Sequence, residues 1–260
     1  MGFSRHYTIT SWPPPDKMIL TALYRLYLLF IAAPLVVVAT VLAGVLTMLG
    51  SMVDGGRRWG YWPAHIWARV CLALTLVKVT VSGRENISAT TSYVFVANHQ
   101  GAYDIFAIYG YLNHNFKWMM KKGLRRFPVI GPACAAAGHI FVDNSSPSAV
   151  RRTMEHAEHT LKGGMSLVVF PEGSRTFTGR MGAFHKGAYQ LSLEFGLPVV
   201  PVTIDGAFFV MPRTTFIPRP GVIRLTIHRP IEAPRDEADR NRVIARSFEA
   251  VQSSLPASCR

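Results

Sequence analysis

Residues 93–104 read YVFVANHQGAYD, and this stretch decides how the fold is predicted. It begins with a short apolar run rich in β-forming residues and ends in polar residues and a glycine. That pattern is typical of a buried strand that leaves the carboxyl edge of a sheet. Ligands of open α/β sheets bind at that edge. The sequence therefore predicts a functional loop directly after this strand.

His99 and Asp104 are the candidate catalytic residues of this loop. On one regular helix, side chains five residues apart point about 140° away from each other. The two can meet if His99 lies in the loop and Asp104 in the first turn of a following helix, where its carboxylate also suits the helix dipole. An imidazole oriented by a carboxylate is the arrangement of a general base. A lone histidine is more often structural, so further evidence is needed.

A second polar loop follows another buried strand, in residues 166–176, which read SLVVFPEGSRT. In this order and separation the two stretches resemble the glycerolipid acyltransferase family, whose pattern is N-H-x-x-x-x-D followed by F-P-E-G-[ST]-R-[ST]. The resemblance covers about residues 60–230 and is greatest to bacterial members that acylate 1-acylglycerol-3-phosphate.

The resemblance implies transfer of an acyl group from a thioester to the sn-2 hydroxyl of 1-acylglycerol-3-phosphate (lysophosphatidic acid), which gives phosphatidic acid. The thioester is acyl-CoA or acyl-ACP (acyl carrier protein), as a co-substrate, and neither a cofactor nor a metal is expected. His99 would accept the alcohol proton, and Asp104 would fix the imidazole tautomer.

The second loop is interpreted as a phosphate site. Arginine can donate two hydrogen bonds to one phosphate, and glycine lets backbone N–H groups approach an anion. Glu172 would repel a phosphate, so we expect it to brace Arg175 or to bind a glycerol hydroxyl. The alternative is a basic, solvated surface loop. With two lysines that the resemblance adds, the expected phosphate-binding residues are Glu172, Gly173, Ser174, Arg175, Lys121 and Lys186.

Pro201 is the candidate acyl-binding residue. Residues 199–203, VVPVT, resemble a family block in which the proline shapes the end of the acyl-binding region. By itself this stretch would pass as a buried strand.

The composition favours a membrane. The net charge of +13 draws the chain to polyanions, and the hydrophobic fraction of 49% favours an anionic bilayer among them. Its three cysteines have no paired or metal-like spacing, which indicates a reducing compartment without structural disulfides or zinc.

The run between Arg25 and Asp54 contains no charged residue and exceeds the ~20 residues that span a bilayer core. We expect residues 1–58 to be a membrane segment, either a span kinked at Pro34 and Gly44 or a re-entrant pair. Residues 59–260 would be the acyltransferase domain, with 59–82 as an amphipathic helix docked on it. An ordinary domain helix is the alternative. The expected location is the inner membrane, with the catalytic domain facing the cytoplasm.

After residue 82, strands and helices alternate, which predicts an α/β fold with a mixed, largely parallel sheet flanked by helices and preceded by N-terminal membrane-associated helices. Strands are expected at 93–97, 117–120, 139–142, 166–170, 199–204 and 222–228. Helices are expected at 147–162, from 187 to about 196, and at 236–253.

Three rival functions remain. The acceptor could be lyso-ornithine lipid or another lysophospholipid, for which the motif would look the same. A membrane-anchored polyanion-binding protein would fit the charge, but no helix-turn-helix, zinc spacing or RNA signature occurs, so no nucleic-acid partner is expected. A hydrolase would need a G-x-S-x-G elbow or a metal cluster, and the sequence contains neither.

Overall fold

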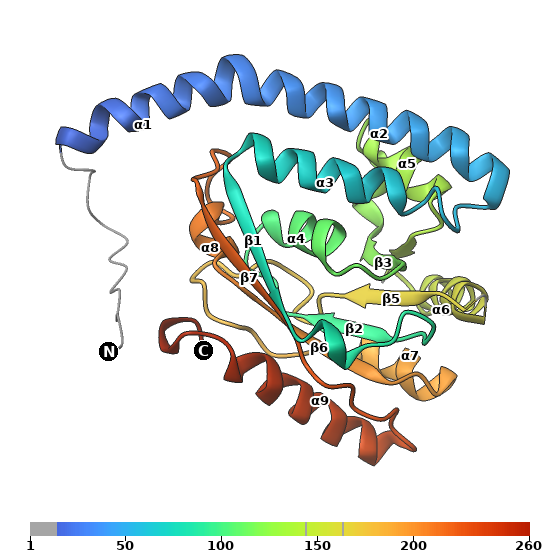
Figure 1. Cartoon of the computed structure of the whole chain (residues 1–260). Helices are drawn as coiled ribbons and strands as arrows, with labels where there is room; N and C mark the ends of the chain where they lie inside the picture. The colour runs from blue at the N-terminus through green and yellow to red at the C-terminus, as the bar shows by residue number, and fades with distance from the viewer. Residues whose placement is uncertain (1–14, 144, 163) are drawn as a thin grey trace.

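One mixed sheet forms the centre of the protein (Figure 1). The computed structural model describes residues 15–143, 145–162 and 164–260. Within these residues the strands are β1 (Val77–Ser82), β2 (Val94–Ala97), β3 (Phe116–Lys121), β4 (Ile140–Val142), β5 (Ser166–Val169), β6 (Val199–Asp205) and β7 (Gly221–Ile227). Their order is β1-β7-β6-β2-β5-β3-β4, and every neighbouring pair is parallel except β6 with β7. The predicted α/β class and largely parallel sheet are confirmed.

Helices cover both faces of the sheet (Figure 1). Phe95 on β2 packs in a core with α3 (Trp62–Leu74) and α4 (Tyr103–Tyr111). Its neighbour Val94 packs in the opposite core, with the helices of the other face. Those helices are α6 (Pro147–Lys162), α7 (Gly187–Phe195) and α9 (Glu237–Ser253). Because β2 is buried on both faces, its sequence is continuously apolar.

The N-terminal segment is one helical run. It consists of α1 (Pro15–Tyr27), the π-helical η1 (Leu28–Ala32) and α2 (Ala33–Asp54). The re-entrant pair is therefore wrong for residues 15–54, whereas residues 1–14 lie outside the described residues. Pro34 lacks an N–H for the helix, and the π-helical stretch just before it is the kind of local rearrangement that accommodates such a loss.

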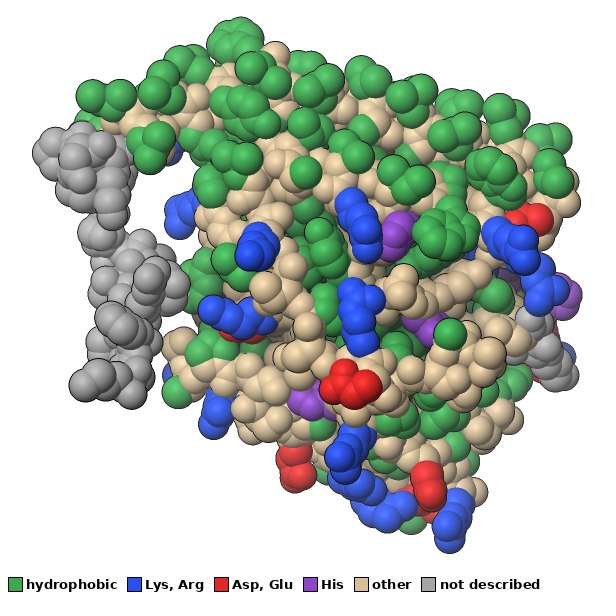
Figure 2. All heavy atoms as spheres, viewed as in Figure 1, with side chains coloured by type: hydrophobic (Ala, Val, Ile, Leu, Met, Phe, Trp, Pro, Cys, Tyr) green, Lys and Arg blue, Asp and Glu red, His purple; other side chains and the backbone are tan. Residues whose placement is uncertain are grey.

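This run crosses the top of the domain as a long bowed helix (Figure 1). Residues Met18–Asp54 are long and apolar enough to span a membrane, by length and composition. The helix also packs on α3 and on α5 (Ile130–Ala136). Gly44 allows that approach, because a Cβ there would lie 2.5 Å from Val129 Cγ1. Its outer side carries exposed apolar side chains, which form a band along the top of Figure 2.

The amphipathic helix α3 lies beneath α2 with an apolar row turned outward. Trp62, Ile66 and Val70 are exposed, whereas His65 is buried, with Nδ1 2.9 Å from the carbonyl oxygen of Tyr109. An outward apolar row is what a helix at a lipid interface presents. Together with α1 and α2, this helix forms an apolar surface that associates the protein with a membrane.

The predicted helix over residues 59–82 is too long. The helix ends at Leu74, and Val77–Ser82 is instead the edge strand β1, paired with β7. Val77 and Val79 are buried while Lys78 and Thr80 are exposed, so the burial alternates with the period of a strand. Val77 also fits the helical spacing of the preceding residues, which is why the sequence interpretation extended the helix through it.

The other predicted helices are confirmed. Ser146 Oγ accepts a hydrogen bond from the N–H of Ala149 at 3.2 Å and caps α6. The helix α7 ends at Gly196, whose φ of 61° is left-handed. The remaining short helices are η2 (Arg84–Asn86), η3 (Lys122–Arg126), α8 (Ala207–Val210) and η4 (Ala257–Cys259).

Candidate active site

His99 and Asp104 meet as predicted, across the junction of β2 and α4. His99 lies in the loop and Asp104 in the first turn of α4, and His99 Nδ1 is 2.7 Å from Asp104 Oδ2. The same oxygen accepts the backbone N–H groups of Gln100 at 2.7 Å and Gly101 at 2.9 Å. A carboxylate only accepts hydrogen bonds, so Nδ1 carries the proton and Nε2 has a free lone pair. That nitrogen is the one available to a substrate.

An aromatic wall holds the His99 ring in place. Phe170, at the end of β5, stacks on it with ring centroids 3.9 Å apart and planes within 6°. Trp118 on β3 also stacks with Phe170, with ring centroids 5.3 Å apart. The His99 side chain is only 15% exposed. The imidazole therefore has one apolar face and one orientation set by Asp104.

Asn98 ties the start of this loop to the neighbouring strand. Its side-chain amide donates to the carbonyl oxygen of Ile204 and accepts from the N–H of Ile204, both at 2.8 Å. The amide thereby continues the pairing of β2 with β6 beyond Ala97. The backbone just before His99 is fixed as a result.

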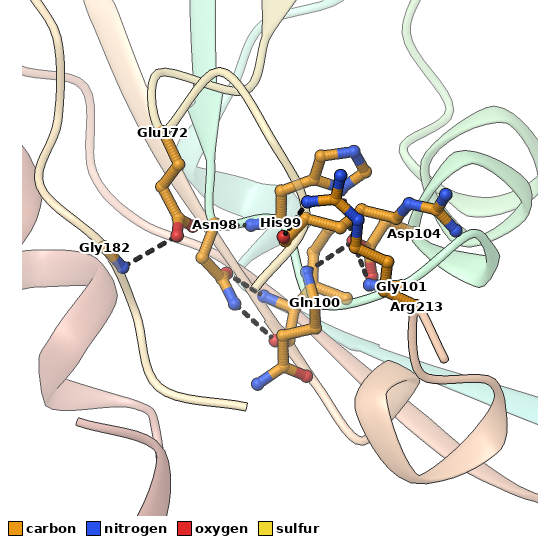
Figure 3. Close-up of polar contacts among 10 residues, drawn as sticks. Asn98, His99, Gln100, Gly101, Asp104, Glu172, Gly182 and Arg213 are labelled. Atoms are coloured by element: carbon orange, nitrogen blue, oxygen red, sulfur yellow. Dashed lines mark hydrogen bonds and ion pairs between the residues drawn. The ribbon is translucent and has the colours of Figure 1, made fainter. Parts of the chain in front are cut away.

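Glu172 joins the two functional loops, and Figure 3 shows it and Asp104 on either side of His99. Its Oε1 accepts the backbone N–H of His99 and its Oε2 accepts that of Gly182, each at 2.7 Å. Burial raises the pKa of Glu172 to about 7, and the two N–H donors oppose that rise. Glu172 thus braces the backbone of both loops, and the predicted contact with the Arg175 side chain is not made.

A cavity of about 540 Å³ opens beside His99. Its polar lining includes Lys121, Ser174, Arg175 and Arg213. Its apolar lining includes Trp67, Ile105, Met120, Phe127, Ile130 and Ala133. Residues of α2 also line it, among them Thr40 and Gly44. One cavity therefore combines a base, cations and a long apolar wall to which the N-terminal helix contributes.

Comparisons with known proteins identify the family of the chain. Residues 78–205 match the family model described as Acyltransferase. The chain is 30% identical to the 1-acyl-sn-glycerol-3-phosphate acyltransferase LPAT1, chloroplastic, of Arabidopsis thaliana, over 93% of this chain and 68% of that protein. The chain belongs to this acyltransferase family.

This acyltransferase is also similar to bacterial proteins. It is 30% identical to the 1-acyl-sn-glycerol-3-phosphate acyltransferase of Pseudomonas aeruginosa, over 67% of this chain and 70% of that protein. The crystal structure of the 1-acyl-sn-glycerophosphate (LPA) acyltransferase, PlsC, from Thermotoga maritima superposes with a TM-score of 0.74 at 26% identity, covering 91% of this chain and 97% of that one.

The structure brings most of the predicted phosphate-binding residues of the acyltransferase together. Gly173, Ser174, Arg175 and Lys121 line the cavity with His99, although they come from separate segments. Lys122, the next residue, instead donates to Asp143 at 2.6 Å, which leaves Lys121 as the lysine of this pair at the cavity.

Two predicted residues lie elsewhere. Lys186 is exposed just before α7 and is absent from the cavity lining among the described residues. Pro201 is buried within β6, opposite Val96 of β2, and likewise does not line the cavity in the described part of the chain. Neither placement supports the predicted role: Pro201 is paired with Val96, which packs in the core on the other face of the sheet, and Lys186 faces solvent.

Arg213 is a site residue that sequence reasoning missed. It lies between α8 and β7, lines the cavity, and donates to the carbonyl oxygen of Arg175 at 3.3 Å. Its guanidinium also lies 4.2 Å from the centre of the Phe177 ring. No motif marks this arginine, and only the fold brings residues 38 positions apart together.

The cysteines are free thiols, and Cys134 lines the cavity. Burial raises the pKa of Cys134 to about 11, so its thiol stays protonated at neutral pH. Among the described residues no group of three or more His, Cys, Asp or Glu side chains could hold a metal ion.

Proposed function

We propose that this acyltransferase transfers an acyl chain from acyl-CoA or acyl-ACP to the sn-2 hydroxyl of lysophosphatidic acid and so forms phosphatidic acid. One observation carries the proposal. The His99–Asp104 pair lies in the same cavity as Lys121 and Arg175 and as a long apolar wall. A base, an anion site and an acyl site are what this reaction needs.

His99 supplies the general base. An alcohol is a weak nucleophile, so Nε2 accepts its proton as the oxygen attacks the thioester carbonyl. Asp104 stabilises the imidazolium that forms. The C–S bond then breaks, and the departing thiolate takes the proton back from the imidazolium. All protons and bonds are accounted for without an acyl-enzyme. The protonated thiol of Cys134 is consistent with direct transfer.

The cations of the cavity would bind the phosphate of the lysolipid, and the apolar wall would bind the acyl chain. Arg175, Lys121 and Arg213 carry the positive charge that a phosphate monoester binds. The residues of α2, α3 and α5 offer an apolar surface for the acyl chain. Because α2 also carries the exposed apolar band, the lysolipid can enter sideways from a bilayer. We infer an inner-membrane location with the catalytic domain in the cytoplasm, where acyl thioesters are available.

The test is turnover by detergent-purified protein given lysophosphatidic acid and an acyl-CoA, with phosphatidic acid followed by mass spectrometry. The His99→Ala variant is measured beside a matched control, His159→Ala, because His159 is exposed on α6. We expect product with the native protein and the control and none with His99→Ala. Acyl-ACP in place of acyl-CoA then identifies the donor.

A different outcome would redirect the proposal. Product only with lyso-ornithine lipid or another lysophospholipid would reassign the acceptor. No product with any lysolipid and either thioester would overturn the proposed reaction.

A further inference from the structure

Residues 211–220, which join α8 to β7, carry exposed apolar side chains beside the cavity. Phe216 is 92% exposed and Ile217 is 51% exposed. Phe177, from the loop after β5, is 65% exposed and lies under the Arg213 guanidinium. Single exposed apolar residues are ordinary, but three large ones on two adjoining loops form a patch that water disfavours.

The segment is built as a closed loop. The N–H of Arg219 donates to the carbonyl oxygen of Val210 at 2.8 Å and closes its base. Inside it, the N–H of Thr215 donates to Pro212 O at 3.2 Å and the N–H of Ile217 to Thr215 Oγ1 at 3.1 Å. Its own bonds therefore hold the loop in shape while Phe216 projects into solvent.

The two segments that carry the patch have charges of one sign. Residues 206–231 and 173–193 contain no Asp or Glu, whereas Arg213 and Arg219 flank Phe216 and Ile217. Basic side chains beside exposed aromatic and aliphatic ones match the chemistry of an anionic bilayer surface.

The segment lies near the membrane-associated helices. Gly221, which follows the segment, pairs with Val77 of β1, so the segment begins β7 beside the turn between α3 and β1 (Figure 1). Tyr24 and Tyr27 of α1 donate to carbonyl oxygens of that turn, those of Thr75 and Leu74, at 2.9 Å each. The segment therefore adjoins the same side of the domain as α1.

We propose that residues 211–220 are a second membrane contact, in which Phe216 and Ile217 enter the interface of an anionic bilayer and Arg213 and Arg219 meet lipid phosphates. Because Arg213 also lines the cavity, this contact holds the cavity opening at the lipid surface. The proposal depends on membrane association and not on which lysolipid is acylated.

The decisive experiment places a fluorescent NBD probe on Phe216→Cys of the full chain. The probe could also label the partly exposed Cys134, so the background carries Cys134→Ala. Cys71 and Cys259 are buried and are left unchanged. A matched control has the probe on Ala245→Cys, an exposed position of α9 on the opposite side of the sheet. Both are bound to vesicles of phosphatidylglycerol and phosphatidylcholine with or without brominated acyl chains. We expect bromine to quench the probe at 216 and not the probe at 245.

A second measurement tests the functional consequence. The Phe216→Ser/Ile217→Ser variant should lose about 10-fold in kcat/KM with lysolipid presented in vesicles, from the lost apolar insertion. With lysolipid dispersed in detergent its activity should be unchanged, because neither residue lines the cavity in the described chain.

Two results would overturn the proposal. One is a probe at 216 that stays as exposed to water as the probe at 245. The other is a kcat/KM of the double variant that stays at the native value with lysolipid in vesicles. A water-exposed probe together with a raised KM for acyl-ACP in the double variant would mean that the patch binds an acidic protein instead. The probe needs no turnover, so an inactive enzyme would contradict the proposed reaction without changing this result.

Discussion

Glu172 accepts the backbone N–H of His99 at 2.7 Å, and this bond ties the loop of the general base to the loop that carries Arg175. The other oxygen of the same carboxylate holds Gly182. The position of the base and the position of the anion site therefore depend on one buried side chain.

The first prediction concerns that brace. Glu172→Ala leaves the N–H groups of His99 and Gly182 without their charged acceptor, a loss of about 1.5–3 kcal/mol per bond. We expect kcat to fall about 10-fold or more, with a smaller change in KM, because the base is displaced. Steady-state kinetics beside Glu194→Ala, an exposed residue of α7, provide the check. A variant as active as that control would show that the brace is dispensable.

The second prediction concerns the orienting carboxylate. Asp104→Asn removes the acceptor that keeps the proton on Nδ1, so Nε2 is no longer reliably free. We expect kcat to fall by about 10²-fold or more. The control is Asp236→Asn, because Asp236 only caps α9 and asparagine caps equally well. Equal turnover of the two variants would exclude the role of Asp104.

The third prediction concerns Arg213. Its replacement by alanine should reduce kcat/KM for lysophosphatidic acid about 10-fold, the size of one charge-assisted hydrogen bond. Activity with a neutral-headgroup lysolipid should change less. Arg180→Ala is the matched control, since Arg180 lies exposed in the loop after β5 and is not part of the described cavity lining. An equal loss of kcat/KM with both lysolipids would mean that Arg213 does not bind the phosphate.

The fourth prediction concerns Cys134. With its thiol protonated, Cys134→Ala should keep turnover within about 3-fold of the native enzyme, since only cavity packing changes. The measurement is the initial rate with acyl-CoA beside His99→Ala. A loss as complete as that of His99→Ala, with folding intact, would instead indicate an acyl-enzyme on this cysteine.

The fifth prediction concerns acid stability. Burial and the nearby Lys117 lower the pKa of His139 to about 3. The unfolded chain takes up this proton near the ordinary pKa of 6.5 and the folded chain does not. The stability from neutral His139 is therefore complete above pH 6.5 and is lost as the pH falls toward 3.

His139→Gln should make the melting temperature less sensitive to acid between about pH 7.5 and about pH 5 than it is in the native protein. His159→Gln, on the exposed side of α6, should keep the native sensitivity. If both variants lose stability in acid as the native protein does, another group controls the acid transition.

Much of the fold could be predicted because the signals are local. The apolar runs at 94–97 and 166–169 identify strands buried on both faces, and a cap or a glycine marks the ends of α6 and α7. The edge strand β1 could not be placed so easily. Val77 fits the helical spacing of α3 and the strand alternation equally well, and its pairing with Gly221 depends on a residue 144 positions away.

The sequence alone determined the order of strands and helices along most of the chain. It also showed how His99 and Asp104 can meet, because they are five positions apart at the junction of a strand and a helix. Only the tertiary structure decided that Glu172 braces the His99 backbone, that Arg213 joins the cavity, and that Lys186 and Pro201 lie away from it. Those relationships depend on which loops meet at one edge of the sheet. That is set by the packing of distant segments, which short-range spacing does not encode.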